Sequence, residues 1–237
     1  PSVTWTPTGT NTPTVTPTPT STYTPTPPST PTGLPYEVSG QLYNPKQWEA
    51  IEVQTVKEAL DTYVAGRGLA MFRAVYLRVP TLPDGAGGLT VGNLNAGIHP
   101  DSASINVLLS DAWASFLNDG QYGKWLVVHE TNHAFLWLRF NNLSRQNNEF
   151  GRPTWQTFVL DPADASVFPT QYAADSYDTG TEYLAEAMTA MLWDRTGEAS
   201  PTTQPHVYNN SPRNIYNADG MDLDTWIRQV LLPGFIP

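Results

Sequence analysis

Apolar side chains recur at helical spacing in several separate stretches of the chain. The first stretch begins at Asn44-Pro45, an N-cap residue followed by proline at the first helical position, and we expect it to end near Gly66. Its apolar positions are Trp48, Ile51, Val56, Leu60 and Tyr63. The same reasoning predicts a short helix over residues 111–117 and longer helices over residues 121–140, 182–193 and 223–232.

Strand patterns are fewer and shorter. Residues 74–79 alternate β-branched and aromatic side chains, and a turn-rich loop follows over residues 80–88. Residues 96–99 and 105–109, separated by the turn Pro100-Asp101-Ser102, are predicted to be paired strands. One helix, a few strands and then mostly helices is typical of an α+β fold, here with a small, mainly antiparallel sheet.

The first 33 residues have a different composition from the rest of the chain. Nearly every second residue is Thr or Pro, and no charged residue occurs before Glu37. Such a segment favours an extended, solvated chain, so we interpret residues 1–33 as a disordered linker or stalk and residues 34–237 as one globular domain. Thr/Pro-rich linkers are typical of secreted or cell-surface proteins; a flexible cytosolic tail is the alternative.

Composition narrows the candidate chemistry. The net charge of -10 without a basic stripe argues against a nucleic-acid partner, and no apolar run is long enough for a membrane span. The chain has no cysteine, which excludes disulfides and thiolate ligands. Any metal must therefore be held by carboxylates and by the four histidines, His99, His129, His133 and His206.

The segment His129-Glu130-Thr131-Asn132-His133 carries the strongest chemical signal. On a helix, His129 and His133 lie on one face and can bind the same ion, while Glu130 is rotated by about 100° and can reach a water on that ion. This is the mechanical basis of the H-E-x-x-H motif, with two Zn²⁺ ligands and a general base. The alternative is a chance match in which the histidines and Glu130 have only structural roles.

A third ligand is expected from a second helix, because no histidine follows His133 closely. Glu182 and Glu186 lie four residues apart on one face of an otherwise apolar helix, and two such carboxylates repel unless a cation or an imidazole N–H lies between them. We assign Glu182 as the third metal ligand and Glu186 as the acceptor of a hydrogen bond from a ligand histidine. Glu182 also fits a capping box with Thr179, which is the structural alternative.

His129-Glu-Thr-Asn-His133 followed by Glu182-Tyr-Leu-Ala-Glu186-Ala resembles the gluzincin metallopeptidases. It is most similar to the compact branch with lethal-factor-like and Pro-Pro endopeptidase-like catalytic domains. The resemblance implies a zincin-like domain with a central active-site helix, and a tyrosine before the third ligand that stabilises the oxyanion. Tyr172 is the favoured candidate, at a spacing that requires a short insertion, and Tyr177 remains open. The resemblance to this branch also implies that the strand before the motif helix, residues 95–99, binds the substrate.

These observations predict a secreted zinc-dependent endopeptidase that acts on a peptide or protein substrate and is attached to a cell wall or surface. A surface-displayed binding module that keeps the fold without the activity is the first alternative. A zinc hydrolase that cleaves another bond is the second, because the motif specifies activated water and not the bond attacked. His99, before Pro100, is interpreted as a loop histidine, and His206 receives no role.

Overall fold

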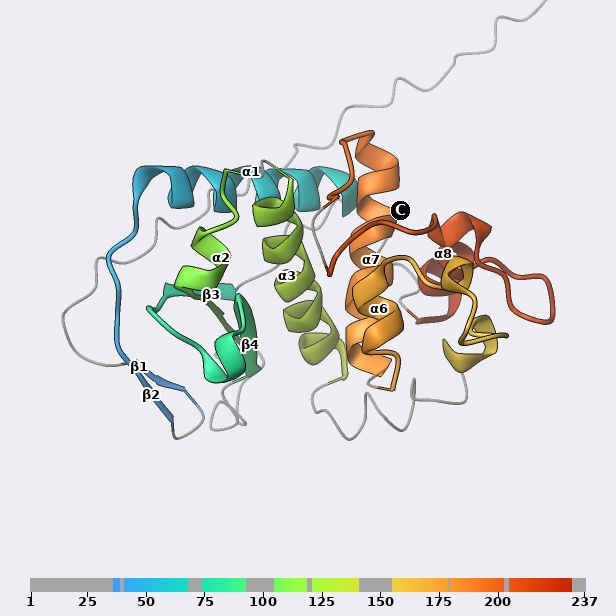
Figure 1. Cartoon of the computed structure of the whole chain (residues 1–237), viewed down its shortest axis with the longest axis horizontal. Helices are drawn as coiled ribbons and strands as arrows, with labels where there is room; N and C mark the ends of the chain where they lie inside the picture. Colours follow the sequence, from blue (N-terminus) through green and yellow to red (C-terminus); the bar gives the residue numbers. More distant parts are fainter. Residues whose placement is uncertain are drawn as a thin grey trace, which may run out of the picture.

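Two long helices that lie side by side form the centre of the molecule (Figure 1). Helix α3 covers Tyr122–Phe140 and helix α7 covers Gly180–Thr196. Helix α1 (Ala50–Arg67) crosses their upper ends in this view and contacts both. The sheet and the one-turn helix α2 (Asp111–Ala114) pack on the other side of α3, while α6 (Gln171–Asp175) and α8 (Leu223–Trp226) contact α7.

The structure is a computed structural model that describes residues 36–38, 41–67, 74–92, 105–118, 121–140, 155–178, 180–202 and 205–231. The Thr/Pro-rich segment 1–33, the expected strand 95–99 and His99 lie outside these residues. None of the described helices has the length and apolar character needed to cross a membrane.

The sheet contains three described strands in the order β3-β5-β4. Strand β5 (Ile105–Leu109) is central, parallel to β3 (Ala74–Arg78) and antiparallel to β4 (Gly88–Gly92). Four of its five side chains are fully buried, as expected of a central strand covered on both faces. Separately, β1 (Tyr36–Val38) and β2 (Gln41–Tyr43) form an antiparallel pair.

The described chain is therefore an α+β structure, as expected, but its three-stranded sheet is mixed and not mainly antiparallel. The antiparallel partner of β5 is Gly88–Gly92, which begins at the end of the segment that the sequence assigned to a loop. Its glycines and its short length hide the strand pattern.

The long helices agree with the sequence prediction to within three residues, except at the start of α1, and the short helix expected over residues 111–117 ends earlier, at Ala114. Asn44-Pro45 does not begin α1, which starts at Ala50 after Glu49. The Glu52 carboxylate accepts a hydrogen bond from the Glu49 amide at 2.9 Å, so a glutamate three residues into the helix provides the cap. The final helix continues from α8 into a π-helical turn, Ile227–Leu231. Helix α6 and the one-turn 3₁₀ segments Pro83–Gly85, Gln156–Phe158, Ala165–Val167 and Pro212–Asn214 have no predicted counterpart.

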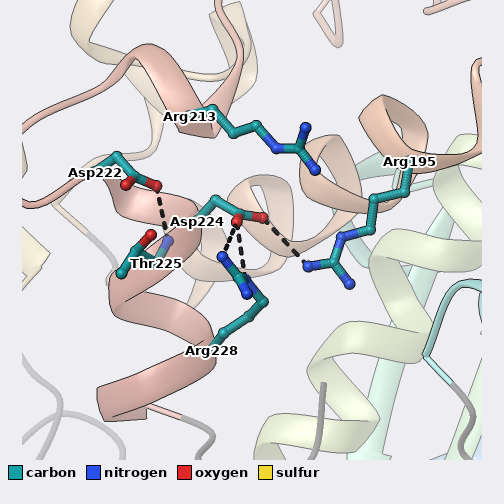
Figure 2. A pocket seen from close by; sticks show the side chains of 6 residues that line it. All are labelled: Arg195, Arg213, Asp222, Asp224, Thr225 and Arg228. Atoms are coloured by element: carbon teal, nitrogen blue, oxygen red, sulfur yellow. Dashed lines mark hydrogen bonds and ion pairs between the residues drawn. The ribbon is translucent and has the colours of Figure 1, made fainter. Parts of the chain in front are cut away.

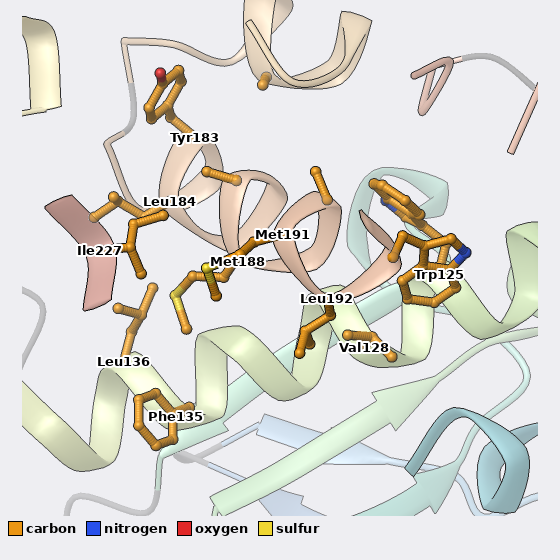
Figure 3. Packing of buried hydrophobic residues seen from close by; sticks show 14 of the residues in the cluster. Trp125, Val128, Phe135, Leu136, Tyr183, Leu184, Met188, Met191, Leu192 and Ile227 are labelled. Carbon is orange, nitrogen blue, oxygen red and sulfur yellow. The ribbon is translucent and has the colours of Figure 1, made fainter. Parts of the chain in front are cut away.

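Helices α3 and α7 run antiparallel and share an apolar seam (Figure 3). Val128, Phe135 and Leu136 of α3 face side chains of α7 that include Met188 and Leu192. The rings of Trp125 and Trp193 pack at a tilt of 54°, with their centroids 4.8 Å apart. Each fully buried side chain of this size contributes about 1.5–3 kcal/mol. The seam therefore fixes the register in which polar groups of the two helices meet.

Candidate metal centre

Four consecutive residues of α3 contact three different elements, α7, β4 and β3, because each residue turns the helix by about 100°. His129 faces α7, and Glu130 faces β4. Thr131 Oγ1 lies 2.8 Å from the hydroxyl of Tyr76 on β3. Asn132 Nδ2 donates to Thr189 Oγ1 on α7 at 2.8 Å. These contacts fix the rotation of α3 and hence the direction of both histidines.

The side chains of His129, His133 and Glu182 meet at one point. The two Nε2 atoms lie 3.0 Å apart, and Glu182 Oε2 lies 3.2 Å from His129 Nε2 and 3.1 Å from His133 Nε2. Three ligands of a tetrahedral Zn²⁺, each about 2.0–2.2 Å from the ion, are roughly 3.3 Å apart. The three atoms thus form the base of such a tetrahedron, and two imidazoles with one carboxylate are a donor set of catalytic zinc sites.

Glu186 lies fully buried behind this group and has four polar partners from three segments of the chain. Its carboxylate accepts hydrogen bonds from Thr170 Oγ1 at 2.6 Å, His206 Nδ1 at 2.8 Å and Trp125 Nε1 at 3.2 Å. His129 Nδ1 is 2.7 Å from Glu186 Oε1, although its N–H is not well aligned with that oxygen. Glu186 therefore sets the orientation of the His129 ring and directs Nε2 toward Glu182 and His133.

The electrostatics of the group favour added positive charge. Burial alone would lower the pKa of His129, but hydrogen bonds to Glu182 and Glu186 outweigh it and raise that pKa well above the ordinary value. Burial alone would raise the pKa of the Glu182 and Glu186 carboxyl groups. The charge of His133 acts against burial at Glu182, and the charge of His206 does so at Glu186, and each carboxyl has a pKa far below its usual range. A bound cation would stabilise the two carboxylates by its positive charge, as protonated imidazoles do.

Glu130 is nearly fully buried next to His129 on the same helix. Thr90 on β4 donates a hydrogen bond to Glu130 Oε2 at 2.7 Å and lies 2.8 Å from the Glu130 carbonyl oxygen. The absence of a side chain at Gly88 makes room, since a Cβ there would lie 2.5 Å from Glu130 Cγ. Strand β4 has no second neighbour among the described strands, so the carboxylate of Glu130 packs against an edge strand.

Tyr172 and Tyr177, the two candidates for the oxyanion donor, have different surroundings. Tyr172 lies on α6 with its ring centroid 5.6 Å from that of His129 and 4.6 Å from that of His206. Burial, then the charge of Glu182, raises the pKa of its phenol, so the group stays a neutral donor. Tyr177 packs against Phe168 and the hydrophobic core. The structure places Tyr172, and not Tyr177, against the histidines.

His206, like Thr90 and Thr170, is a site residue that the sequence did not identify. It is buried, and its segment is fixed beside α6 by a backbone hydrogen bond from Gln171 N to Val207 O at 3.0 Å. Thr170, which caps α6 through Ala173 N, also donates to Glu186. The scarcity of histidine is the one sequence signal for His206, because its Pro/Thr/Asn-rich surroundings resemble an ordinary loop.

The other expected site residues are brought together. His129, Glu130 and His133 come from α3, Glu182 and Glu186 from α7, and Tyr172 from α6. Glu182 Oε2 contacts both histidines, which favours the ligand assignment over a helix cap; Thr179, the proposed cap, lies outside the described residues.

Comparison of the chain with protein-family models, with curated proteins and with solved structures finds no match. The case for a function therefore depends on the sequence motifs and on the geometry of this centre.

Proposed function

We propose that this chain is a zinc-dependent endopeptidase of the gluzincin type with a zincin-like catalytic domain. The observation that carries the proposal is the convergence of His129 Nε2, His133 Nε2 and Glu182 Oε2 within 3.2 Å of one another, with Glu130 next to them on the same helix. A bound Zn²⁺ supplies a water of lowered pKa and polarises the scissile carbonyl.

The side chains of this centre have distinct roles in the proposed reaction. Glu130 accepts the proton of the attacking water and passes it to the leaving amine. Thr90 holds one oxygen of that carboxylate and so fixes its orientation. Tyr172 donates a hydrogen bond from its phenol to the developing oxyanion. Glu186 and His206 position His129.

The edge strand β4 is the proposed substrate-binding element. An extended peptide that pairs with Gly88–Gly92 would lie along the strand that contacts Glu130. This assignment replaces residues 95–99, which lie outside the described residues. The Thr/Pro-rich residues 1–33 support a secreted or cell-surface enzyme that acts on a peptide or protein substrate at a cell wall or surface.

Glu130→Gln tests this function. It keeps the size of the side chain and removes the base, so turnover of a quenched fluorescent peptide library should fall by about 10²–10⁴. Zinc content, measured by elemental analysis, should stay at the wild-type level. Glu58→Gln, the same change at an exposed position of α1, serves as the matched control and should leave both unchanged.

Full hydrolysis by a zinc-loaded Glu130→Gln variant would exclude Glu130 as the base. A zinc-loaded wild type that cleaves no peptide in the library but binds peptides would favour the inactive binding module. Cleavage of ester substrates without cleavage of peptides would instead identify a hydrolase of another bond.

A further inference from the structure

A second polar pocket lies at the opposite end of α7 from the metal centre (Figure 2). It is open to solvent and has a volume of about 430 Å³. Arg195 comes from the end of α7, Arg213 from the 3₁₀ turn Pro212–Asn214, and Arg228 from the π-helical turn after α8. Asp222, Asp224 and Thr225 complete the lining. Arg195 follows Glu182 by thirteen positions on α7, a distance of roughly 20 Å along the axis.

Asp224 holds two of the three arginines in place. It is almost fully buried, and its Oδ2 accepts a hydrogen bond from Arg228 Nε at 2.9 Å and lies 2.8 Å from Arg228 Nη2 in an ion pair. Arg195 Nη2 lies 3.6 Å from Asp224 Oδ1, an ion pair longer than a direct hydrogen bond. One carboxylate therefore faces two guanidinium groups.

Arg213 adds a third positive charge. Its side chain has no ion-pair partner among the described residues, and Figure 2 shows it extending over the pocket toward Arg195. Asp222 adds a second carboxylate to the lining, and its Oδ1 accepts a hydrogen bond from Thr225 N at 2.8 Å as the N-cap of α8. It forms no ion pair with Arg213 in the described part of the chain. Burial lowers the pKa of Arg195. The positive charges of Arg228 and Arg213 act in the same direction, and the negative charge of Asp224 opposes them.

This concentration of positive charge is unusual in a chain of net charge -10. Three of its twelve basic residues line one pocket and lie close enough to repel one another. Two of the three are kept there by a buried carboxylate, so their approach is built into the fold. Such an arrangement becomes favourable when an anion lies between the guanidinium groups.

We propose that the pocket formed by Arg195, Arg213 and Arg228 binds the phosphate group of a small phosphate monoester or the free phosphate ion. A guanidinium group donates paired hydrogen bonds to phosphate oxygens, and a doubly charged ligand matches several guanidinium groups better than a single carboxylate does. The volume falls within the range of about 300–1,000 Å³ that holds small organic ligands. This site is independent of the proposed peptidase activity.

The test is calorimetric titration of the full chain at low salt with inorganic phosphate and, separately, with glycerol 1-phosphate. Arg213→Ala should weaken binding roughly 10- to 100-fold, because it removes charged hydrogen bonds from a side chain that the described fold does not use. Lys57→Ala, which removes one positive charge from an exposed position of α1, is the matched control and should leave the affinity unchanged. Thermal unfolding of both variants should match the wild type.

Equal affinities for the two ligands would identify phosphate itself as the recognised unit, and tighter binding of the ester would show that its organic part also occupies the pocket. Either result supports the proposal. Absence of binding by both ligands at millimolar concentration, or equal affinities of wild type and Arg213→Ala, would overturn it. The second result would assign any binding to another site, such as the metal centre. Peptide hydrolysis measured on the same samples reports separately on the proposed enzyme.

Discussion

The Arg78 cluster (Arg78, Glu52 and Asp111) and the group formed by His129, His133 and Glu182 both place ionisable side chains in or near the protein interior. In the Arg78 cluster the guanidinium group is fully buried and makes five hydrogen bonds. They go to the carboxylates of Glu52 and Asp111 and to the carbonyl oxygens of Val79 and Leu109. Positive donors meet negative acceptors, and every N–H group has a partner.

The histidine group is arranged in the opposite way. Two imidazole nitrogens and a carboxylate oxygen point at one another at 3.0–3.2 Å, so groups that can all act as acceptors converge on a common point. Glu186, directly behind them, adds a second buried carboxylate. Buried charge alone therefore does not identify a functional site. The distinguishing feature is whether donors and acceptors satisfy one another or converge on a position that a cation fits.

The largest expected difference between the two clusters concerns the stability of the metal-free protein. Arg78→Met removes the partner of a buried carboxylate, Glu52, and should lower the free energy of unfolding by about 3–5 kcal/mol. Glu182→Ala should lower it by about 1 kcal/mol or less, because the Glu182 side chain is 28% exposed and solvent screens its charge. Urea unfolding in the presence of a chelator measures both. A larger loss for Glu182→Ala would mean that the histidine group, too, is chiefly structural.

A second prediction distinguishes Tyr172 from Tyr177 as the donor to the oxyanion. Tyr172→Phe should reduce kcat by about 10²–10³ if the phenol stabilises the oxyanion, with a small change in zinc content. Tyr177→Phe should leave kcat unchanged, because that ring packs on Phe168. Steady-state kinetics of the two variants provide matched measurements, and the reverse pattern would reassign the donor to Tyr177.

His206→Ala should have a smaller effect, because His206 acts through Glu186 and His129. A loss of about 10- to 100-fold in zinc affinity or activity is expected for such a positioning residue. His206→Asn, which keeps a side-chain N–H donor, should recover part of the zinc affinity. Competition with a chelator of known affinity measures this property. Equal zinc affinities of His206→Ala and wild type would show that Glu186 orients His129 without His206.

The smallest expected effect belongs to the exposed rim of the Arg78 cluster. The hydrogen bond from Lys46, with a contribution from Arg78, lowers the pKa of Asp111. Its ion pairs therefore stabilise the fold above the unfolded-state pKa of about 3.9, and this contribution is lost as the pH falls through the lower folded-state pKa. Asp111→Asn should flatten the acid side of the stability curve by less than about 1 kcal/mol, since half of the side chain is exposed. Chemical unfolding between pH 2 and 7 tests this, and an unchanged acid slope would contradict it.

The long helices could be predicted from the sequence because each has its own apolar period and end signals, as over residues 121–140 and 182–193. The sheet was predicted less well. Strand β4 contains two glycines in five residues, and its place beside β5 depends on tertiary pairing and not on local preference. Similarly, Glu52 displaces the expected cap at Asn44 because its carboxylate both caps α1 and pairs with Arg78.

The residues of the candidate centre also fall into two sets, those that the sequence identifies and those that depend on the tertiary fold. The spacing of His129 and His133, and of Glu182 and Glu186, specifies which side chains share a helical face, so these residues could be found without a structure. Thr90, Thr170 and His206 reach the centre from a strand and from loop segments. Their positions depend on how the chain folds back on α3 and α7, for which the sequence contains no periodic signal.

The most direct test of the account is the zinc content of purified wild type and of Glu182→Ala after equal exposure to zinc. Near-stoichiometric zinc in the wild type, lost or strongly weakened in the variant, is the predicted result. A folded wild type that takes up no zinc, or a Glu182→Ala variant that keeps it with unchanged affinity, would contradict the three-ligand centre on which the proposed function depends.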